Sequence, residues 1–141
     1  MEFLSNYQIR EVAAATVDGT DAVVSAIVDM SGFTSVTFVT SIATANAGNY
    51  ISVQQDDANA TDNMADLEGS KVIALANGNL VAVEVKPTKQ FVQATVTRGA
   101  STAVGPILAI LGGAVRTKPC DNIVTNEIDA EIHAHPAEGT A

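Results

Sequence analysis

Alternation of apolar and polar side chains, broken by short turn signals, runs through most of this 141-residue chain. Alternation combined with β-branched residues is typical of strands that bury one face, whereas a helix repeats its apolar positions every three to four residues. Residues 34–44 show the pattern most clearly, with Val36, Phe38 and Thr40 on one side. The chain is therefore predicted to be all-β.

Turn signals divide the alternation into about eight strands. They include Asp18-Gly19, Ser31-Gly32 and Asn77-Gly78, and the last favours a hairpin because both of its central residues suit positive φ. Eight strands in two packed sheets is the count of a jelly-roll β-sandwich, although periodicity alone leaves the topology open. The predicted strands span residues 7–16, 22–30, 34–44, 50–55, 72–76, 80–86, 91–98 and 103–115.

Two local features depart from a plain strand pattern. Pro106 lacks the N–H that a central strand needs, so it predicts an edge position or a bulge in the last strand. Residues 62–67 are the one good helical stretch and predict one or two turns inside the loop between the fourth and fifth strands.

The length indicates one domain, which we expect to be a sandwich over residues 1–118 followed by an extended C-terminal arm over 119–141. Residues 127–135 of the arm alternate strictly, with apolar side chains on one side and acidic or histidine side chains on the other. Such a segment needs a surface to bury its apolar face. It either adds a strand to its own sheet or lies on a neighbouring copy or partner, and the sequence leaves both open.

Charge is segregated along the chain, whose formal net charge is −9. An acidic segment at 56–68 is followed by a basic stretch and then by an acidic arm without Lys or Arg after Lys118. The segregation fits solvated faces, or electrostatic matching between the basic stretch and an acidic arm or loop of a neighbour. The acidic balance argues against nucleic acid as a partner. The basic stretch contains Lys86, Lys89, Arg98, Arg116 and Lys118.

No membrane segment or disulfide is expected. The longest apolar stretch, 104–115, is too short for a bilayer and is broken by Pro106, Gly112 and Gly113. Cys120 is the sole cysteine, so no intramolecular disulfide can form. The first six residues lack the basic and apolar regions of a signal peptide, and we expect synthesis in the cytoplasm.

Two sets of polar side chains are weak metal candidates. Asp57, Asn59 and Glu68 have part of the spacing of an EF-hand calcium loop, but the sixth position is Asp62 instead of the required Gly. His133 and His135 lie on one side of the arm, where two imidazoles fall short of a closed zinc site. We therefore predict no metal and no cofactor.

Enzymatic activity is not expected. The chain has no Gly-x-Ser-x-Gly elbow and no phosphate-binding glycine loop. Its two histidines are both in the arm, away from any rigid pocket that would orient a base.

Several stretches together resemble the cement, or decoration, proteins on the heads of short-tailed phages, such as the Bordetella phage cement protein family. They are residues 1–4 (MEFL), 28–33 (VDMSGF), 62–69 (DNMADLEG), 98–107 (RGASTAVGPI) and 135–141 (HPAEGTA). The resemblance implies a jelly-roll homodimer on the outer capsid surface of the virion. There it would bridge neighbouring major capsid proteins and stabilise the shell.

The alternative is a glycan- or calcium-dependent receptor-binding module of a phage spike or fibre, which the jelly-roll pattern and the acidic loop would also fit. For either function the interface candidates are the N-terminal apolar pair, the cations and the apolar arm positions. These residues are Phe3, Leu4, Lys86, Lys89, Arg98, Arg116, Lys118, Ile128 and Ile132.

Overall fold

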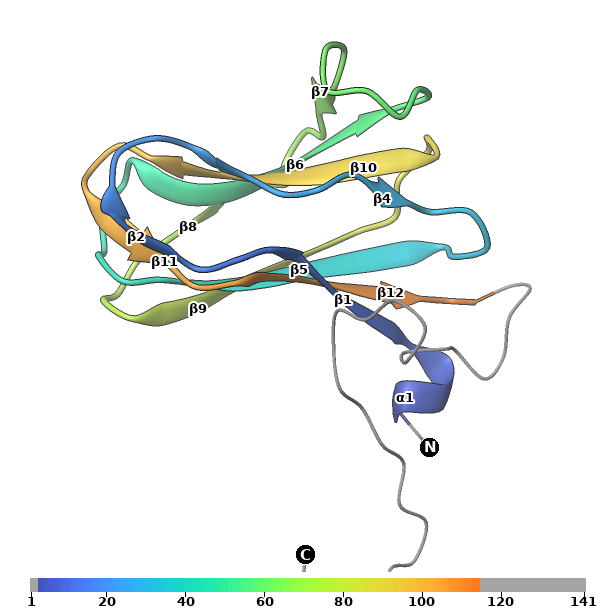
Figure 1. The fold of residues 1–141 in the computed structure, drawn as a ribbon, viewed down its shortest axis with the longest axis horizontal. Helices are drawn as coiled ribbons and strands as arrows, with labels where there is room; N and C mark the ends of the chain where they lie inside the picture. Colours follow the sequence, from blue (N-terminus) through green and yellow to red (C-terminus); the bar gives the residue numbers. More distant parts are fainter. Residues whose placement is uncertain (1–2, 115–141) are drawn as a thin grey trace, which may run out of the picture.

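Two antiparallel sheets, packed face to face, make up the computed structural model, which describes residues 3–114 (Figure 1). A four-residue helix, α1 (Phe3–Asn6), precedes them. Sheet A contains β1 (Gln8–Ala13), β2 (Thr16–Gly19), β5 (Ser35–Ile42), β9 (Asn79–Val85), β11 (Thr102–Val104) and β12 (Ile107–Gly112). Sheet B contains β3 (Val23–Val24), β4 (Val28–Asp29), β6 (Asn49–Asp56), β7 (Ala65–Asp66), β8 (Val72–Ile73) and β10 (Phe91–Arg98).

The described residues contain twelve strands, but in four cases two consecutive short strands continue one another along the same neighbour. Counting each such pair as one interrupted line, and each unbroken strand as a line, gives eight lines. The interrupted lines are β1–β2, β3–β4, β7–β8 and β11–β12, each of which runs along one neighbouring strand or line. Counted along the chain, sheet A has the order first, eighth, third, sixth, and sheet B the order second, seventh, fourth, fifth. This interleaved order is that of a jelly roll. The predicted fold class is confirmed, and the interruptions are additional to it.

The core is one aliphatic layer between the sheets. On β5 every second residue is buried, and Phe38 and Ile42 are fully enclosed, as the alternation in residues 34–44 predicts. Ile51 and Val53 of β6 and Val92 of β10 meet them from sheet B. Branched aliphatic side chains fill the roughly 10 Å between two packed sheets without large aromatics. The poverty of the chain in aromatic residues is therefore no obstacle to its core.

The Pro106 interruption is a bulge inside sheet A, so the edge alternative is wrong. The β11–β12 line lies between β1–β2 and β5. Val104 pairs with Ile42 and Leu108 with Val39, so four steps on one strand oppose three on the other. The missing N–H of proline thus falls where one residue is left out of the hydrogen-bond ladder.

Two sequence-based expectations between β6 and β9 are wrong. Residues 62–67 form no helix, because Ala65 and Asp66 pair as β7 with Gln55 and Gln54 of β6, which satisfies their backbone groups. Asn77-Gly78 forms a turn, with Gly78 at φ +67°. This turn joins β8 of sheet B to β9 of sheet A, so it is not a hairpin.

Asp18-Gly19 was also expected to turn. Both residues instead end β2, and the chain bends at the next two positions.

The loops β5–β6 and β10–β11 touch through two glycines at one end of the sandwich. The Gly99 N–H donates to the Gly48 carbonyl at 2.9 Å. A Cβ on Gly99 would lie 2.8 Å from Gly48 Cα, and a Cβ on Gly48 would lie 3.1 Å from Gly99 Cα. The fully buried Asn49 side chain donates to the Thr44 carbonyl and accepts from the Ala100 N–H, which fixes the same two loops together.

Candidate interaction surfaces

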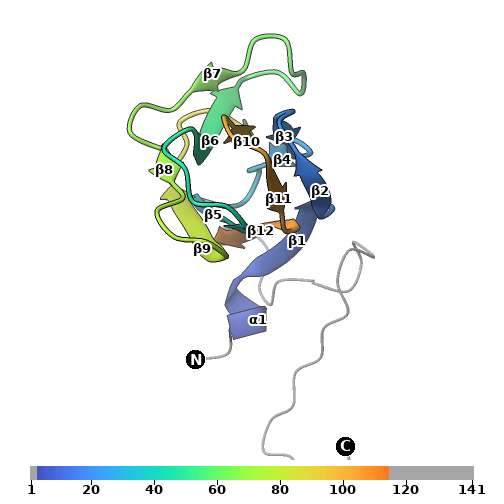
Figure 2. The ribbon, with the colours of Figure 1, turned by 90° about the vertical axis from the view of Figure 1, so that its left-hand side faces the viewer.

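The interrupted lines β1–β2 and β3–β4 form one side of the sandwich (Figures 1 and 2). The two sheet edges are joined here, since the Ala26 N–H donates to the Val12 carbonyl at 2.7 Å. At the break in β3–β4, the buried Ser25 hydroxyl accepts from the Ala94 N–H at 3.0 Å, and Gln93 Nε2 donates to the Ser25 carbonyl at 2.7 Å. Hydrogen bonds to the hydroxyl and the carbonyl of Ser25 therefore replace regular strand pairing at this break.

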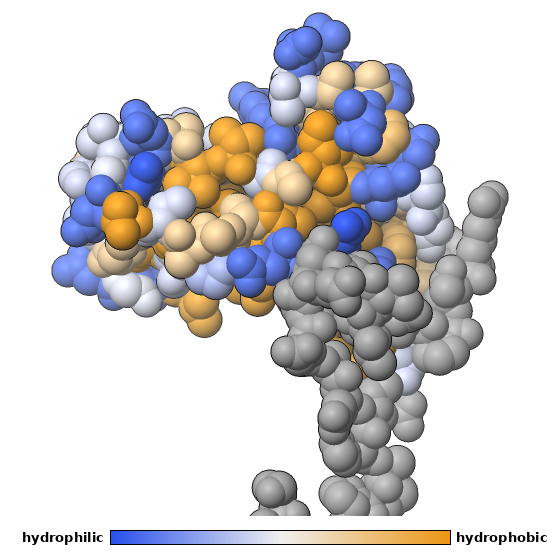
Figure 3. All heavy atoms as spheres, in the orientation of Figure 1, coloured by the Kyte–Doolittle hydropathy of each residue, from blue (hydrophilic) through white to orange (hydrophobic). Residues whose placement is uncertain are grey.

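Exposed apolar side chains collect on the same side, as Figure 3 shows in orange and tan along the region between the sheets. Val17 is 85% exposed and Val24 is 50% exposed. We call this set the alanine–valine surface; its residues are Ala14, Ala15, Val17, Ala22, Val24 and Ala26, all exposed.

Arg98 fixes the backbone beneath this surface. Its Nη1 donates to the carbonyls of Val17 and Thr102, both at 3.0 Å, and its Nε donates to the carbonyl of Asp21. The predicted interface cation is therefore occupied with three carbonyls of its own chain. It makes the β2–β3 turn a rigid support for Val17 and Val24.

The opposite side ends in β9, a regular seven-residue edge strand. Among the described residues β9 pairs only with β5, so its other edge has no strand beside it there. Val81 and Val83 point into the core, while Leu80, 72% exposed, lies on the outer face with Glu84. Lys86 follows β9, is exposed, and forms no ion pair with the described residues.

The acidic loop after β6 meets the basic stretch within this chain. Lys89 Nζ lies 3.3 Å from Asp57 Oδ2 and 3.8 Å from Asp56 Oδ1. Asp57, Asn59 and Glu68 are all exposed. No group of three or more His, Cys, Asp or Glu residues that could hold a metal occurs within residues 3–114. Lys89 of the basic stretch therefore pairs with the acidic loop of its own chain, whereas the sequence-based hypothesis placed such pairing between neighbouring copies.

The N-terminal pair, Phe3 and Leu4, lies in α1. The Phe3 ring stacks on Tyr7 with centroids 4.8 Å apart and remains 48% exposed. Tyr7 in turn covers Gly112, where a Cβ would lie 2.9 Å from its Cε1. This stacking holds α1 at the end of β12. No helix in the described part of the chain is long and apolar enough to cross a membrane.

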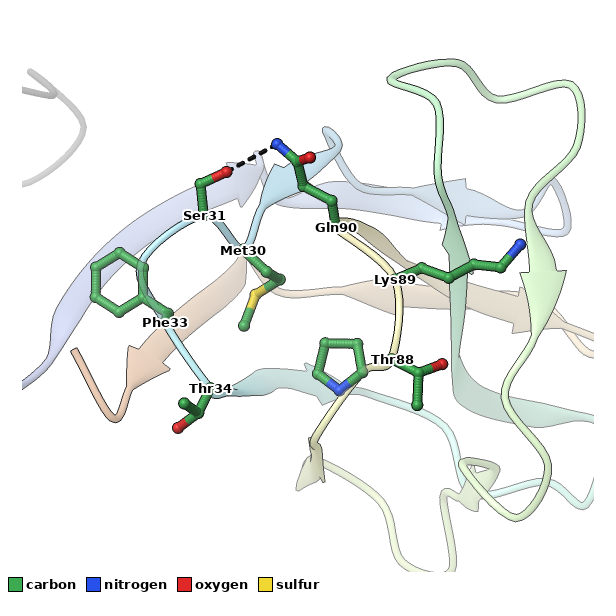
Figure 4. A pocket seen from close by; sticks show the side chains of 8 residues that line it. Met30, Ser31, Phe33, Thr34, Thr88, Lys89 and Gln90 are labelled. Atoms are coloured by element: carbon green, nitrogen blue, oxygen red, sulfur yellow. Dashed lines mark hydrogen bonds between the residues drawn. The ribbon is translucent and has the colours of Figure 1, made fainter. Parts of the chain in front are cut away.

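An open depression of about 410 Å³ lies between the β4–β5 and β9–β10 loops, and Met30, Phe33 and Pro87 are among its lining residues (Figure 4). At its rim Gln90 Nε2 donates to Ser31 Oγ at 2.8 Å and to Asp29 Oδ1 at 3.0 Å.

Asp29 also accepts from the Ser31 N–H at 2.8 Å. Desolvation alone would raise the pKa of Asp29. It is outweighed by the hydrogen bonds from Ser31 and Gln90 and by the charge of Arg10, which together hold this pKa below its ordinary value of 3.8.

The remaining predicted residues and the boundary at 118/119 lie outside the described residues. These residues are Arg116, Lys118, Ile128, Ile132, His133 and His135.

Sequence reasoning missed the alanine–valine surface and the exposed Leu75 and Leu80. A signal was present, because residues 12–17 and 22–28 carry apolar side chains at both odd and even positions. A strand with two apolar faces in a two-sheet sandwich must expose one of them.

No protein-family model matches the chain, and no curated protein matches it in sequence. Among solved structures, the PBSX exported protein XepA is similar, with a TM-score of 0.55 and 17% sequence identity. The match covers 100% of this chain and 45% of XepA, so the chain spans less than half the length of that protein. At this identity the likeness shows a shared fold.

Proposed function

We propose that this chain is a structural protein of a phage particle that binds the outside of an icosahedral head and stabilises the shell by bridging neighbouring major capsid proteins. XepA, which shares the fold over the whole length of this chain, is phage-derived. The sequence resemblance to phage cement proteins points to the same class. The partners in this proposal are the major capsid protein and a second copy of the chain, and we assign the protein no catalytic reaction.

The alanine–valine surface is the observation that carries this proposal. Its apolar side chains are exposed on a backbone that Arg98 and the Ala26–Val12 hydrogen bond hold in place. Apolar residues exposed together on a rigid frame are typical of protein–protein contact surfaces. Because a capsid repeats its binding site many times, a weak contact per copy gives firm attachment when each copy bridges two sites.

Copy number in purified virions tests the role. Quantitative mass spectrometry should find the protein at an abundance close to that of the major capsid protein. A few tens of copies would instead indicate a vertex, fibre or tail component, and absence from the virion would exclude every particle role.

A matched pair of variants tests the surface. Val17 and Leu75 are almost equally exposed, at 85% and 82%, so an aspartate at either position introduces the same charge with little effect on folding. Val17→Asp should weaken binding to capsids stripped of this protein by at least about tenfold, because a charge is desolvated in the contact. Leu75→Asp should bind like the wild type. Equal binding of all three proteins would exclude the alanine–valine surface as the contact.

A glycan-binding module of a spike or fibre is the second candidate, and the depression in Figure 4 favours it. Phe33 lines it together with residues that carry hydroxyl and amide groups, including Thr34, Thr88 and Gln90, a combination that suits a sugar. Phe33→Ala and Gln90→Ala should then both abolish binding on a glycan array. The calcium-dependent form has less support, since the Asp57 carboxylate pairs with Lys89. A calcium-induced rise in melting temperature would restore it.

A further inference from the structure

Within residues 3–114 no strand pairs with the outer edge of β9, which makes this edge a template for another strand. Exposed edges are normally blunted by proline, by bulges, by several charges or by very short strands. β9 has seven residues, pairs with β5 in unbroken register from Val85 to Asn79, and contains no proline. Glu84 is its single charged residue. An edge of this kind promotes aggregation unless another strand pairs with it or another segment covers it.

The core is also thinly covered on this side. Leu67, Val72 and Val85 are apolar and pack against the core, yet each is only partly buried. Leu67 and Val72 belong to the β7–β8 region, which contacts β9 across the two sheets, and Figure 2 shows β8 and β9 on the same side. A strand beside β9 with apolar side chains facing inward would cover this margin.

The chain that follows β12 reaches this edge in the favoured direction. Gly112 pairs with Ser35 and Val85 pairs with Val36, so β12 and β9 end at the same end of sheet A. A segment that turns back after β12 therefore runs antiparallel to β9, as all pairs in this sheet do, but parallel to β1 at the opposite edge. The direction favours β9.

The connection is long enough. From β12 across β5 and β9 to a new strand is three strand spacings, or about 14 Å. Residues 115–126 are twelve in number and can span up to about 40 Å when extended.

Residues 127–135 match the edge chemically. Ile128, Ala130, Ile132 and Ala134 alternate with acidic and histidine residues, so one face suits the apolar margin and the other suits water. Lys86 lies at the end of β9 where the segment would arrive, opposite in charge to Glu127. We propose that residues 127–135 of the same chain add a strand to sheet A, antiparallel to the outer edge of β9.

Amide hydrogen exchange of the full chain, followed by NMR, tests this. In the wild type, the amides of residues 79–85 that do not bond to β5 should be protected. Ile128→Asp/Ile132→Asp should lower their protection at least tenfold and leave the amides bonded to β5 unchanged. The control Asp129→Asn/Glu131→Gln changes only the outer face and should keep the protection. If these β9 amides are unprotected in the wild type, or equally protected in the aspartate variant, the proposal is wrong.

Dilution separates the same chain from a second copy. A strand from the same chain gives protection that is independent of protein concentration, whatever mass analytical ultracentrifugation gives. Protection that falls on dilution together with the mass would show that a neighbouring copy supplies the strand, which overturns the proposal. Because these measurements need no capsid, their outcome is independent of the proposed role on the phage head.

Discussion

The two open sides of this sandwich handle their sheet edges in opposite ways. On the side of β1–β4 the edge strands are interrupted and are joined by the hydrogen bond from the Ala26 N–H to the Val12 carbonyl, while Val17 and Val24 are exposed. On the side of β9 the edge is regular and seven residues long. Exposed apolar side chains and an exposed backbone edge are thus separate properties. The first suits docking of a rigid surface, and the second suits strand addition.

The largest effect should come from removing the support of the interrupted side. Arg98→Ala leaves the carbonyls of Val17, Asp21 and Thr102 without their charged donor, and we expect a loss of about 3 kcal/mol in the free energy of unfolding. Urea denaturation measures it. Lys71→Ala, which removes only an exposed cation 4.0 Å from the Tyr50 ring, should cost less than about 1 kcal/mol. Equal losses in the two variants would contradict the role of Arg98.

The break in β3–β4 should be next in size. Ser25→Ala removes the acceptor of the buried Ala94 N–H, and we expect a loss of about 1–2 kcal/mol. The exposed Ser101, changed to Ala, serves as the control and should stay within about 0.5 kcal/mol of the wild type. If Ser25→Ala left the free energy of unfolding unchanged, water would satisfy the Ala94 N–H as well as the hydroxyl does.

Asp29 gives the interrupted side a small pH dependence. Its pKa is lowered in the folded state, so its contribution to stability is present above 3.8, its ordinary value, and is lost as the pH falls through the folded value. Asp29 is exposed, and solvent screening keeps the contribution well below about 1 kcal/mol. The wild type should be slightly more stable than Asp29→Asn near neutral pH, and the difference should vanish once the pH has fallen below the lowered pKa of Asp29. A constant difference would exclude the carboxylate charge as its cause.

The smallest effect on stability is expected on the outer face of β9. Leu80→Lys replaces a side chain that is 72% exposed, so the free energy of unfolding should change by less than about 0.5 kcal/mol. Solubility at high concentration should rise, because an exposed leucine on an edge strand promotes association. A loss above about 1 kcal/mol would show that another part of the protein covers Leu80.

The eight lines of the jelly roll could be predicted because one-sided burial leaves a readable alternation, as in β5. Their interruptions could not. Small apolar residues at 12–17 and 22–28 fit both a continuous and a broken strand, and the break depends on Ser25 finding Ala94, which is 69 positions away. The helix predicted at 62–67 failed because pairing with β6 outweighed local propensity.

The predicted interface cations among the described residues also differ in how far the sequence could reveal their surroundings. Lys86 is exposed, as an interface cation should be, whereas Lys89 and Arg98 are engaged with groups of their own chain. Backbone carbonyls have no sequence signature, so the partners of Arg98 could not be predicted. The outer edge of β9 likewise follows from strand order, which periodicity does not encode.

The contact between Gly48 and Gly99 constrains how this sequence can evolve. A side chain at Gly99 would overlap the backbone of Gly48, and one at Gly48 would press closely on Gly99. Replacement of either glycine therefore requires the two loops to separate, which also breaks the Asn49 bonds that join them. In descendants of this chain the two glycines should persist together or disappear together. A loop that lengthens after residue 99 should be accompanied by a compensating change near residue 48.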